Sequence, residues 1–447
     1  MPSPITETET PVLLHIEKLV HGGRGLAHTD SLAVFVPGVL PGESIRALLD
    51  RPRKDYAEGR LVEVVTPSAD RITPACPVYG LCGGCQLQHA APGAQLELKR
   101  AILAETLLRV GGLRDLSVPD LIPSPDNFAY RNRARFSVSH DGPGQATLAY
   151  HQEGSARLIP ISECLVLAPP LNEMLAHLNV LLPGSAQMRL LEVSLTTSND
   201  TGEVVIRYLA ERATRREAEA WFRRVQDRGG VSGQVLIAGR GPEARRWVEG
   251  KTTLTERIAG CTFQCSDGSF AQANTKLNTA LAANVQNWAV NGLAAFPLRV
   301  LELYAGIGNF GLPIAREGAL VTLVEGSRTA LADARENAKI NHIGRCRFRE
   351  MSAEAMLEAS AAGEYDLVVL DPPRTGLSKE ALVGLTRLGS PRILYVSCDP
   401  STLARDLRAF VKAGYRVARL QGYDLFPQTM HIETLVELVR GECPALH

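Results

Sequence analysis

The chain has 447 residues, of which 45% are hydrophobic, so it can bury several cores, and its length fits about three domains. Its 48 lysines and arginines balance 48 aspartates and glutamates, so any binding of nucleic acid must come from local patches. No basic region precedes an apolar run at the N-terminus, and no apolar run is long enough to span a membrane. We therefore expect a cytoplasmic monomer without a membrane partner. Residues 1–10 are expected to be a disordered lead-in before the first folded domain.

Short strand-like runs separated by glycine-rich turns fill residues 11–67, and they predict a small all-β barrel. The runs cover residues 12–16, 32–36, 44–49 and 60–65. The glycines around Arg24 and the basic loop Arg51-Pro52-Arg53-Lys54 suit a barrel that touches a phosphate backbone. A solvated loop explains the same charges equally well.

Nine cysteines in a chain expected to be cytoplasmic favour metal binding or catalysis over disulfides. Cys76, Cys82 and Cys85 form a C-x5-C-x2-C arrangement with glycines between the last two. Cys164 is the best placed fourth ligand, and the spacing predicts a metal centre. An iron–sulfur cluster and a zinc ion both remain open at this point.

The middle of the chain is predicted to be a mixed α+β region. A helix over residues 96–110 stops at Gly111-Gly112, and a charged helix over 211–228 is expected to present a solvated face. Between them, residues 130–138 alternate as a strand does, with arginines on one face at Arg131, Arg133 and Arg135. Three neighbouring guanidiniums favour a bridging anion such as an RNA backbone, although a solvated face remains an alternative.

The C-terminal part reads as a parallel α/β sheet. A helix at 275–290 leads into a buried strand at 298–303, which ends in a turn containing Gly306, Gly308 and Gly311; a second strand at 320–324 ends at Glu325. This pattern fits either a nicotinamide dinucleotide or S-adenosylmethionine. The later turn Asp371-Pro372-Pro373 is typical of methyltransferases and decides for S-adenosylmethionine.

Two further apolar runs, at residues 367–370 and 393–396, predict a strand, a crossover helix and a parallel strand. The first run delivers Asp371 and the second delivers Cys398. Because ligands of a parallel sheet sit outside the carboxyl ends of its strands, we expect the acid and the thiol to share one cleft.

A thiol in this cleft indicates methylation of a carbon. An exocyclic amine needs no enzyme thiol, and the aromatic residue that usually follows Asp-Pro-Pro in amine methyltransferases is replaced by Arg374. Carbon 5 of uracil is a poor nucleophile until a thiolate adds to carbon 6, and a base must then remove the carbon-5 proton. Cys398 is the predicted nucleophile, and Glu433, just before a final strand at 435–439, is the predicted base. Cytosine-5 methylation, a redox protein built on the cysteines, and a non-catalytic RNA-binding module are the alternatives.

Taken together, the chain resembles the bacterial RNA uracil-5 methyltransferases, which modify ribosomal RNA or the T-loop of tRNA. The matching pieces span residues 11–440: a TRAM-like barrel, the cysteine motif, YRNR, SFAQAN, the glycine-rich turn, DPPR, SCDP and HIE. The resemblance implies an RNA substrate, most of all 23S rRNA with tRNA as the alternative, contacted by the barrel and the three arginines. It implies a [4Fe-4S] cluster held by Cys76, Cys82, Cys85 and Cys164. It implies an S-adenosylmethionine site lined by Gln272, Tyr304, Gly306, Asn309, Glu325, Ser352 and Asp371. Ser352 departs from the Asp or Asn that the family often has near the adenine.

The predicted architecture is therefore multidomain. It comprises an OB-like TRAM barrel at 11–67, a central α+β iron–sulfur and RNA-binding domain at 68–92 and 126–262, and a Rossmann-like class I methyltransferase domain at 93–125 and 263–447. Because Cys164 would pin the 76–85 loop onto the central domain, we expect loss of the cluster to loosen RNA binding or folding before it affects methyl transfer.

Overall fold

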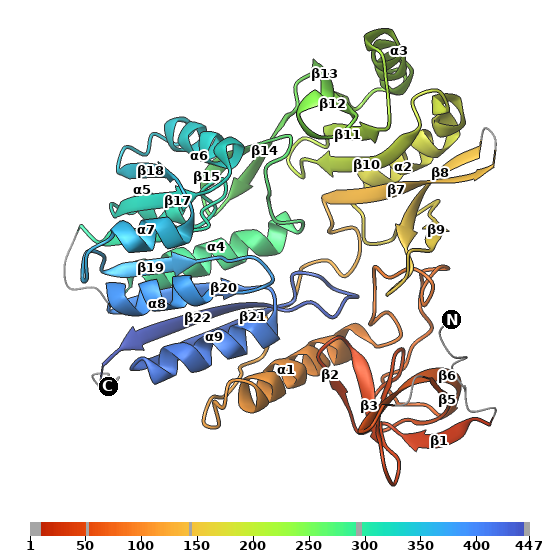
Figure 1. The fold of residues 1–447 in the computed structure, drawn as a ribbon, viewed down its shortest axis with the longest axis horizontal. Coiled ribbons are helices and arrows are strands. Elements are labelled where there is room, and N and C mark those ends of the chain that lie inside the picture. Colours follow the sequence, from red (N-terminus) through yellow and green to blue (C-terminus); the bar gives the residue numbers. More distant parts are fainter. Residues whose placement is uncertain (1–9, 51–52, 143–144, 292–296, 442–447) are drawn as a thin grey trace.

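The computed structural model describes residues 10–50, 53–142, 145–291 and 297–441, and Figure 1 shows their arrangement. The strands of these residues form an N-terminal, a central and a C-terminal sheet and a two-stranded hairpin. Residues 1–9 of the lead-in expected at 1–10, and Arg51 and Pro52 of the basic loop, lie outside the described residues. Within the described ranges, no helix has the length and apolar character needed to cross a bilayer.

The N-terminal sheet is curled around its own apolar core. Its six strands run in the order β1-β5-β6-β4-β3-β2 and are β1 (Val12–His15), β2 (Lys18–Val20), β3 (Arg24–His28), β4 (Ala33–Val36), β5 (Ser44–Asp50) and β6 (Tyr56–Thr66). The two edge strands are consecutive in the chain. Between them, the Ile16 amide donates to Glu43 and the Glu17 amide donates to Leu26, so the bend at Ile16 links both ends of the sheet.

Strands β2 and β3 were not predicted, because the glycines at 22, 23 and 25, which follow β2 and enter β3, indicate turns. At Gly25 a side chain would overlap Val39, so close packing inside the sheet, and not a turn, requires glycine there. The four strands that were predicted form with shifts of a few residues at their ends.

Helix α1 (Pro92–Arg109) connects the N-terminal half of the chain to the C-terminal domain. It begins four residues before the predicted start, because Pro92 has the fixed φ that suits a first helical turn. Its buried residues Ile102, Leu103 and Leu107 pack in one core with residues of α9 (Pro400–Lys412). Figure 1 shows α1 beside α9, below the C-terminal sheet.

A buried ion pair fixes α1 to the segment that precedes the last strand. The Lys99 ammonium, fully buried, donates to Asp424 Oδ1 at 2.5 Å and to the Phe426 carbonyl at 3.0 Å. Burial lowers the pKa of Lys99, and the charge on Asp424 acts in the opposite direction.

Replacing Lys99 by methionine is expected to lower the free energy of unfolding by about 3–5 kcal/mol, because the Asp424 carboxylate would stay buried without its partner. Urea unfolding measures this change. The double variant Lys99→Met, Asp424→Leu should recover most of the loss, since it leaves no buried charge. A loss below about 1 kcal/mol in the single variant, the range of an exposed pair, would contradict the prediction.

The central sheet has seven strands in the order β13-β12-β11-β10-β7-β8-β9. They are β7 (Arg133–Gly142), β8 (Gln145–His151), β9 (Leu158–Pro160), β10 (Leu190–Thr197), β11 (Val204–Ala210), β12 (Val231–Ala238) and β13 (Arg245–Gly250). Helices α2 (Pro169–Leu181) and α3 (Arg215–Gln226) and two 3-10 turns (Leu182–Ser185 and Gly241–Glu243) accompany them.

Two predictions for this region need correction. The strand of the three arginines begins at Arg133 and not at Tyr130, because the backbone of Arg131 pairs with Val166 and Ala168 instead of continuing along the sheet. Helix α3 is shorter than the predicted range 211–228; its arginines are exposed as expected, while Trp221 and Phe222 are buried in the central core.

The C-terminal sheet has the order β18-β17-β16-β19-β20-β22-β21. Its strands are β16 (Arg299–Leu303), β17 (Leu320–Glu325), β18 (Cys346–Glu350), β19 (Leu367–Leu370), β20 (Arg392–Ser397), β21 (Tyr415–Tyr423) and β22 (Glu433–Arg440). Its helices are α4 (Thr275–Val290), α5 (Gly311–Arg316), α6 (Arg328–Ile340), α7 (Ala353–Ala359), α8 (Lys379–Leu388) and α9. A hairpin of β14 (Thr253–Ile258) and β15 (Cys261–Ser266) joins it to the central sheet.

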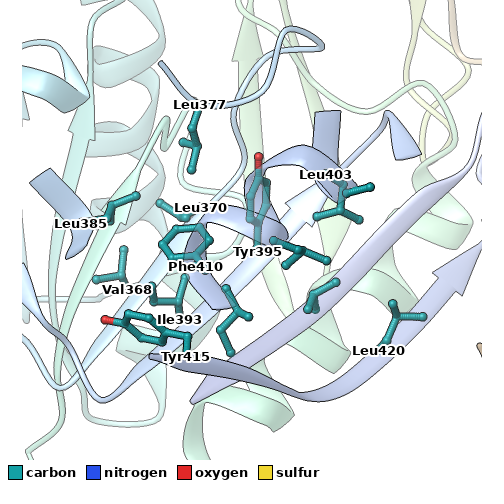
Figure 2. Close-up of a cluster of buried hydrophobic side chains, with 14 of the residues drawn as sticks. Val368, Leu370, Leu377, Leu385, Ile393, Tyr395, Leu403, Phe410, Tyr415 and Leu420 are labelled. Carbon is teal, nitrogen blue, oxygen red and sulfur yellow. The ribbon is translucent and has the colours of Figure 1, made fainter. Parts of the chain in front are cut away.

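The predicted strand, crossover helix and parallel strand are confirmed as β19, α8 and β20. Five strands are parallel, and β22 inserts antiparallel between β20 and β21. Figure 2 shows the core on one side of this sheet, where Val368 of β19 and Ile393 of β20 lie near Phe410 of α9. Glu433 is the first residue of β22, not the residue before it.

Candidate active site

A cavity of about 770 Å³ lies at the carboxyl ends of the parallel strands, between the central and C-terminal sheets. It brings together the predicted residues from all parts of the chain: Cys76, Cys82, Cys85, Arg131, Arg133, Arg135, Cys164, Gln272, Tyr304, Gly306, Asn309, Glu325, Asp371, Cys398 and Glu433. Ser352 is not among its lining residues. That side chain is exposed, and its oxygen accepts the Ala355 amide at 3.1 Å as the N-cap of α7.

The glycine-rich turn after β16 holds an acidic side chain in place. Tyr304, Gly306 and Gly308 all have positive φ, and a side chain at Gly308 would lie 2.8 Å from Leu312. The Gly306 amide donates to Glu325 Oε2 at 2.9 Å, while the Ser327 amide donates to Oε1 at 2.7 Å. The turn therefore fixes the carboxylate at the end of β17 beside the cavity.

Glu302, within β16, is a buried acid that the sequence reasoning missed. A side chain at Gly311 would overlap its Oε2, so glycine is required where α5 passes over this carboxyl. Burial raises the pKa of Glu302 to about 8, while the backbone amides of Gly311 and Phe310 lower it. The only signal in the sequence was an acid among the apolar residues at 300–303.

Cys398 and Glu433 lie next to each other across two strands. Ser397 of β20 pairs with Thr434 of β22 in antiparallel register. Cys398, directly after Ser397, is therefore opposite Glu433, directly before Thr434. Burial raises the pKa of the Cys398 thiol to about 12, and the charges of Glu433 and Asp371 raise it further. Arg374 acts in the opposite direction.

Two carboxyl groups of the cavity, those of Asp371 and Glu433, have a pKa above the ordinary value. Burial raises the pKa of Asp371 to about 7 and that of Glu433 well above its ordinary value, and the Asp371 charge raises the pKa of Glu433 further. Both oxygens of Glu433 lack a hydrogen-bond partner among the described residues. A carboxyl that is buried, unpartnered and beside a thiol suits proton transfer near neutral pH.

Arg374 and His431 form a polar pair at this cavity. Nη2 of Arg374 lies 3.3 Å from Nε2 of His431. Burial lowers the pKa of His431 to about 4, with Arg374 as the next cause, so the imidazole is neutral and accepts from the guanidinium. The sequence indicated Arg374 only as the residue in place of an aromatic ring in the DPPR motif, and His431 only as part of the HIE motif.

Replacing Arg374 by methionine is expected to slow alkylation of Cys398 by iodoacetamide. The thiolate is the reacting form, and loss of the positive charge raises the thiol pKa further above the working pH. The rate at pH 8 should fall about tenfold, since an opposite charge at short range moves a pKa by about one unit or more. Mass spectrometry of the Cys398 peptide against pH measures this, and the slowed rate should recover as pH rises. Arg374→Lys should stay close to the unmodified protein; an equal loss there would contradict the electrostatic cause.

A side chain from the turn between β2 and β3 contacts Asp399, the residue after Cys398. His21 Nε2, in the turn between β2 and β3, lies 3.4 Å from Asp399 Oδ2, and Asp399 Oδ1 accepts the amides of Ser401 and Thr402 at the start of α9. Burial acts to raise the pKa of Asp399, but His21 and these amides lower it to about 2. The contact joins residues almost 400 positions apart, so no local pattern indicated it.

The four predicted metal cysteines line one end of the cavity. Burial raises the pKa of Cys85 to about 11 and that of Cys164 to about 12, and their neighbouring thiols raise both further. Within the described residues, no three His, Cys, Asp or Glu side chains are close enough to hold a single metal ion.

The three predicted arginines line the same cavity. Arg135 is largely exposed and lies 3.5 Å from Glu192, and Arg131 Nε donates to the Arg133 carbonyl at 3.0 Å. The guanidinium of Arg133 lies 5.8 Å from the ring centre of Phe270, which is 66% exposed. A positive wall with an open aromatic ring suits a nucleic acid with an unstacked base.

Five parallel strands, an inserted antiparallel β22 and a glycine-rich turn with an acid at the next strand end define a class I methyltransferase. The family model described as tRNA (Uracil-5-)-methyltransferase matches residues 93–441. The chain belongs to this family and is an S-adenosylmethionine-dependent RNA (uracil-5-)-methyltransferase.

Relatives match along nearly the whole chain. The 23S rRNA (uracil(1939)-C(5))-methyltransferase RlmD of Alkalilimnicola ehrlichii is 36% identical over 96% of this chain and 97% of its own. That of Shewanella amazonensis is 34% identical over 98% of each chain. Among solved structures, the Pyrococcus abyssi tRNA (uracil-54, C5)-methyltransferase in complex with S-adenosyl-L-homocysteine has a TM-score of 0.74 and 25% identity, covering 96% of this chain and 100% of its own.

Proposed function

We propose that the enzyme methylates carbon 5 of a uridine in 23S rRNA through a covalent bond between Cys398 and carbon 6, with Glu433 as the base. The observation that carries this proposal is the position of the half-buried thiol and the unpartnered carboxyl side by side in one cavity with the glycine-rich turn.

Each step uses a group of the cavity. Cys398 Sγ adds to carbon 6 as a thiolate, and the electrons of the 5,6 double bond move towards the carbon-4 carbonyl to give an enolate. Carbon 5 then takes the methyl group from S-adenosylmethionine, which leaves as S-adenosylhomocysteine. Glu433 accepts the carbon-5 proton, the double bond re-forms, and the Sγ–carbon 6 bond breaks to release the thiolate. The positive charge of Arg374 favours the thiolate form of Cys398, both before it adds to carbon 6 and when it is released.

The S-adenosylmethionine site is proposed at the glycine-rich turn. Glu325, held by two amides, would take the ribose hydroxyls, and Gln272, Tyr304, Gly306, Asn309 and Asp371 would line the rest. Asn309 exchanges hydrogen bonds with Asn278 of α4, which fixes its amide plane. The predicted contact of Ser352 has no support from its position outside the cavity lining.

We also propose that Cys76, Cys82, Cys85 and Cys164 hold a [4Fe-4S] cluster. The donor set fits: the four thiols are half-buried and line the same cavity, and thiolates gathered there repel one another unless positive charge lies between them. Four thiolate ligands, one for each iron, would hold the cluster. When bound, the cluster would supply a rigid joint between the 76–85 loop and the central sheet.

Purified without air, the protein should be brown, with broad visible absorption and about four iron and four sulfide per chain, the content of one such cluster. Cys164→Ser should lower the iron content. Cys346→Ser is the matched control, because Cys346 lies in β18 and should leave the iron content unchanged. A colourless protein with one zinc per chain would contradict the cluster.

The RNA partner is proposed to contact Arg131, Arg133, Arg135 and the N-terminal sheet. 23S rRNA is favoured because the relatives that match along both whole chains are 23S rRNA enzymes. The T-loop of tRNA is the second candidate, since the Pyrococcus abyssi enzyme acts on a tRNA uracil. Cytosine-5 methylation is less favoured, and the monomer expected from the sequence stays a prediction.

The test is mass mapping of methyluridines in RNA from cells that lack this gene, before and after incubation with the purified protein and S-adenosylmethionine. The expected result is one 5-methyluridine that is missing from the 23S rRNA of these cells and is restored by the protein. A methyl group that returns only in the tRNA T-loop would establish the second candidate, and 5-methylcytidine would overturn the proposed chemistry.

A further inference from the structure

The base Glu433 follows an irregular segment that has no strand partner. This segment, residues 424–432, is called the base loop here, and it connects β21 to β22 and carries His431. Its hydrogen bonds go to segments far away in the sequence. Among them are residues 76–87, called the cysteine loop here, which contain three of the four predicted metal cysteines.

Gln86, the residue directly after Cys85, bonds to both loops. Its amide nitrogen donates to the Gln428 carbonyl at 3.0 Å, and its side-chain Oε1 accepts the Met430 amide at 3.4 Å. Its Nε2 donates to the Gly83 carbonyl at 2.9 Å, and its own carbonyl accepts from the Tyr79 hydroxyl at 2.7 Å. Every polar group of Gln86 therefore connects one loop to the other or holds the cysteine loop.

Gln428 is the matching residue on the base loop. It is buried and has φ +70°, a left-handed conformation that side chains rarely adopt. In this conformation its carbonyl accepts the amides of both Gln86 and Leu87, at 3.0 and 2.9 Å. Its amide and its Oε1 bond to the Gln95 side chain, each at 3.0 Å. Backbone strain of this kind persists where the surroundings hold it in place.

We propose that Gln86 and Gln428 are positioning residues for proton abstraction, because they make the cysteine loop and the base loop one hydrogen-bonded unit that places Glu433 beside Cys398. The inference rests on the proposed function of Glu433. That carboxyl has no hydrogen-bond partner of its own among the described residues, so its position depends on β22 on one side and on the base loop on the other. A base displaced by about 1 Å can lose about 10²-fold in rate.

This coupling changes the expectation for the metal centre. From the sequence, a disturbed cysteine loop should affect RNA binding or folding first. The hydrogen bonds of Gln86 instead carry such a disturbance to the base loop, so proton abstraction should be affected while the thiol still adds to the RNA.

Two rates separate these steps. RNA with 5-fluorouridine at the target should form a covalent adduct that cannot proceed, since fluorine does not leave as a proton does; the rate of its formation reports addition and methyl transfer without the base. Turnover of normal RNA requires the base as well. The measured quantity is the ratio of turnover to adduct formation, in the full-length protein purified without air.

Gln86→Met keeps the side-chain length and removes the two side-chain hydrogen bonds, with the Gly83 carbonyl and the Met430 amide. Gln428→Val disfavours the left-handed backbone. Both should lower the ratio about tenfold or more, with adduct formation changed by less than about threefold. Gln428→Asn, which tolerates positive φ, should restore most of the ratio. The matched control is Gln421→Met in β21, which removes a glutamine bond to the Asp120 carbonyl away from both loops and should leave the ratio unchanged.

A purely structural role would lower both rates together, and that outcome, or an unchanged ratio in Gln86→Met, would overturn the proposal. If Gln428→Val does not fold, the variant Gln86→Met tests the proposal by itself, because Gln86 is only half-buried. The proposed function has its own controls in the same assay. If the unmodified enzyme forms no adduct with 5-fluorouridine RNA, the covalent mechanism fails; if it does and the ratio is insensitive to Gln86, only the present inference fails.

Discussion

Replacing Cys398 by alanine should leave RNA and S-adenosylmethionine binding intact and reduce methylation by about 10⁴-fold or more, the loss that removal of a covalent nucleophile causes. The side chain lies at the end of β20 with no structural hydrogen bond in the described part of the chain, so its removal should not disturb the sheet. Without Sγ no bond to carbon 6 can form, and carbon 5 stays too weak a nucleophile to accept the methyl group.

Denaturing gels with labelled 5-fluorouridine RNA check this prediction. The unmodified enzyme should give a band of enzyme linked to RNA, and Cys398→Ala should give none. Cys265→Ala is a suitable control, because Cys265 is another half-buried cysteine of the C-terminal half and should keep the band. A linked band that survives in Cys398→Ala would remove Cys398 from the role of nucleophile.

Replacing Glu433 by glutamine should have the opposite signature: one methyl group is transferred and the enzyme then remains bound to its RNA. The amide keeps the shape of the buried side chain but cannot accept the carbon-5 proton, so the Sγ–carbon 6 bond cannot break. Turnover should fall by about 10²–10⁴-fold, the range that general bases contribute.

Normal RNA, without fluorine, distinguishes this variant from all others. Glu433→Gln should accumulate the linked band on normal RNA, with the methyl group already present in the adduct by mass spectrometry. Glu437→Gln, four residues further along β22, is the control, since Glu437 pairs with Arg392 and Arg419 and does not line the cavity. A variant Glu433→Gln that releases its product at the normal rate would show that another group is the base.

The linear order of the chain was enough to predict the elements that carry the chemistry. The apolar runs before Asp371 and Cys398 and the glycines after Leu303 are local patterns, and each appeared as a strand end of the C-terminal sheet. Because parallel strands end at the same edge, these patterns also predicted that the acid and the thiol share a cavity. Family resemblance supplied the remaining residues, and only Ser352 lies away from that cavity.

Local patterns failed where packing decides the backbone. Glycine at position 25 looked like a turn, yet it lies in strand β3 because a side chain there would overlap Val39. Arg131 alternates with its neighbours as a strand residue does, yet its backbone bonds to Val166 and Ala168.

The sequence by itself determined the strand ends, since these depend on periodicity over a few residues, and it supplied the proposed nucleophile, the proposed base and the four cysteines as residue types at fixed positions. Only the tertiary structure decided how they are tuned and held. The contacts of Lys99 with Asp424, His21 with Asp399 and Gln86 with Gln428 each join positions more than 300 residues apart. They exist because segments far apart in the chain pack together near the cavity, and burial there raises the pKa of Cys398 and Glu433, which no local pattern can encode.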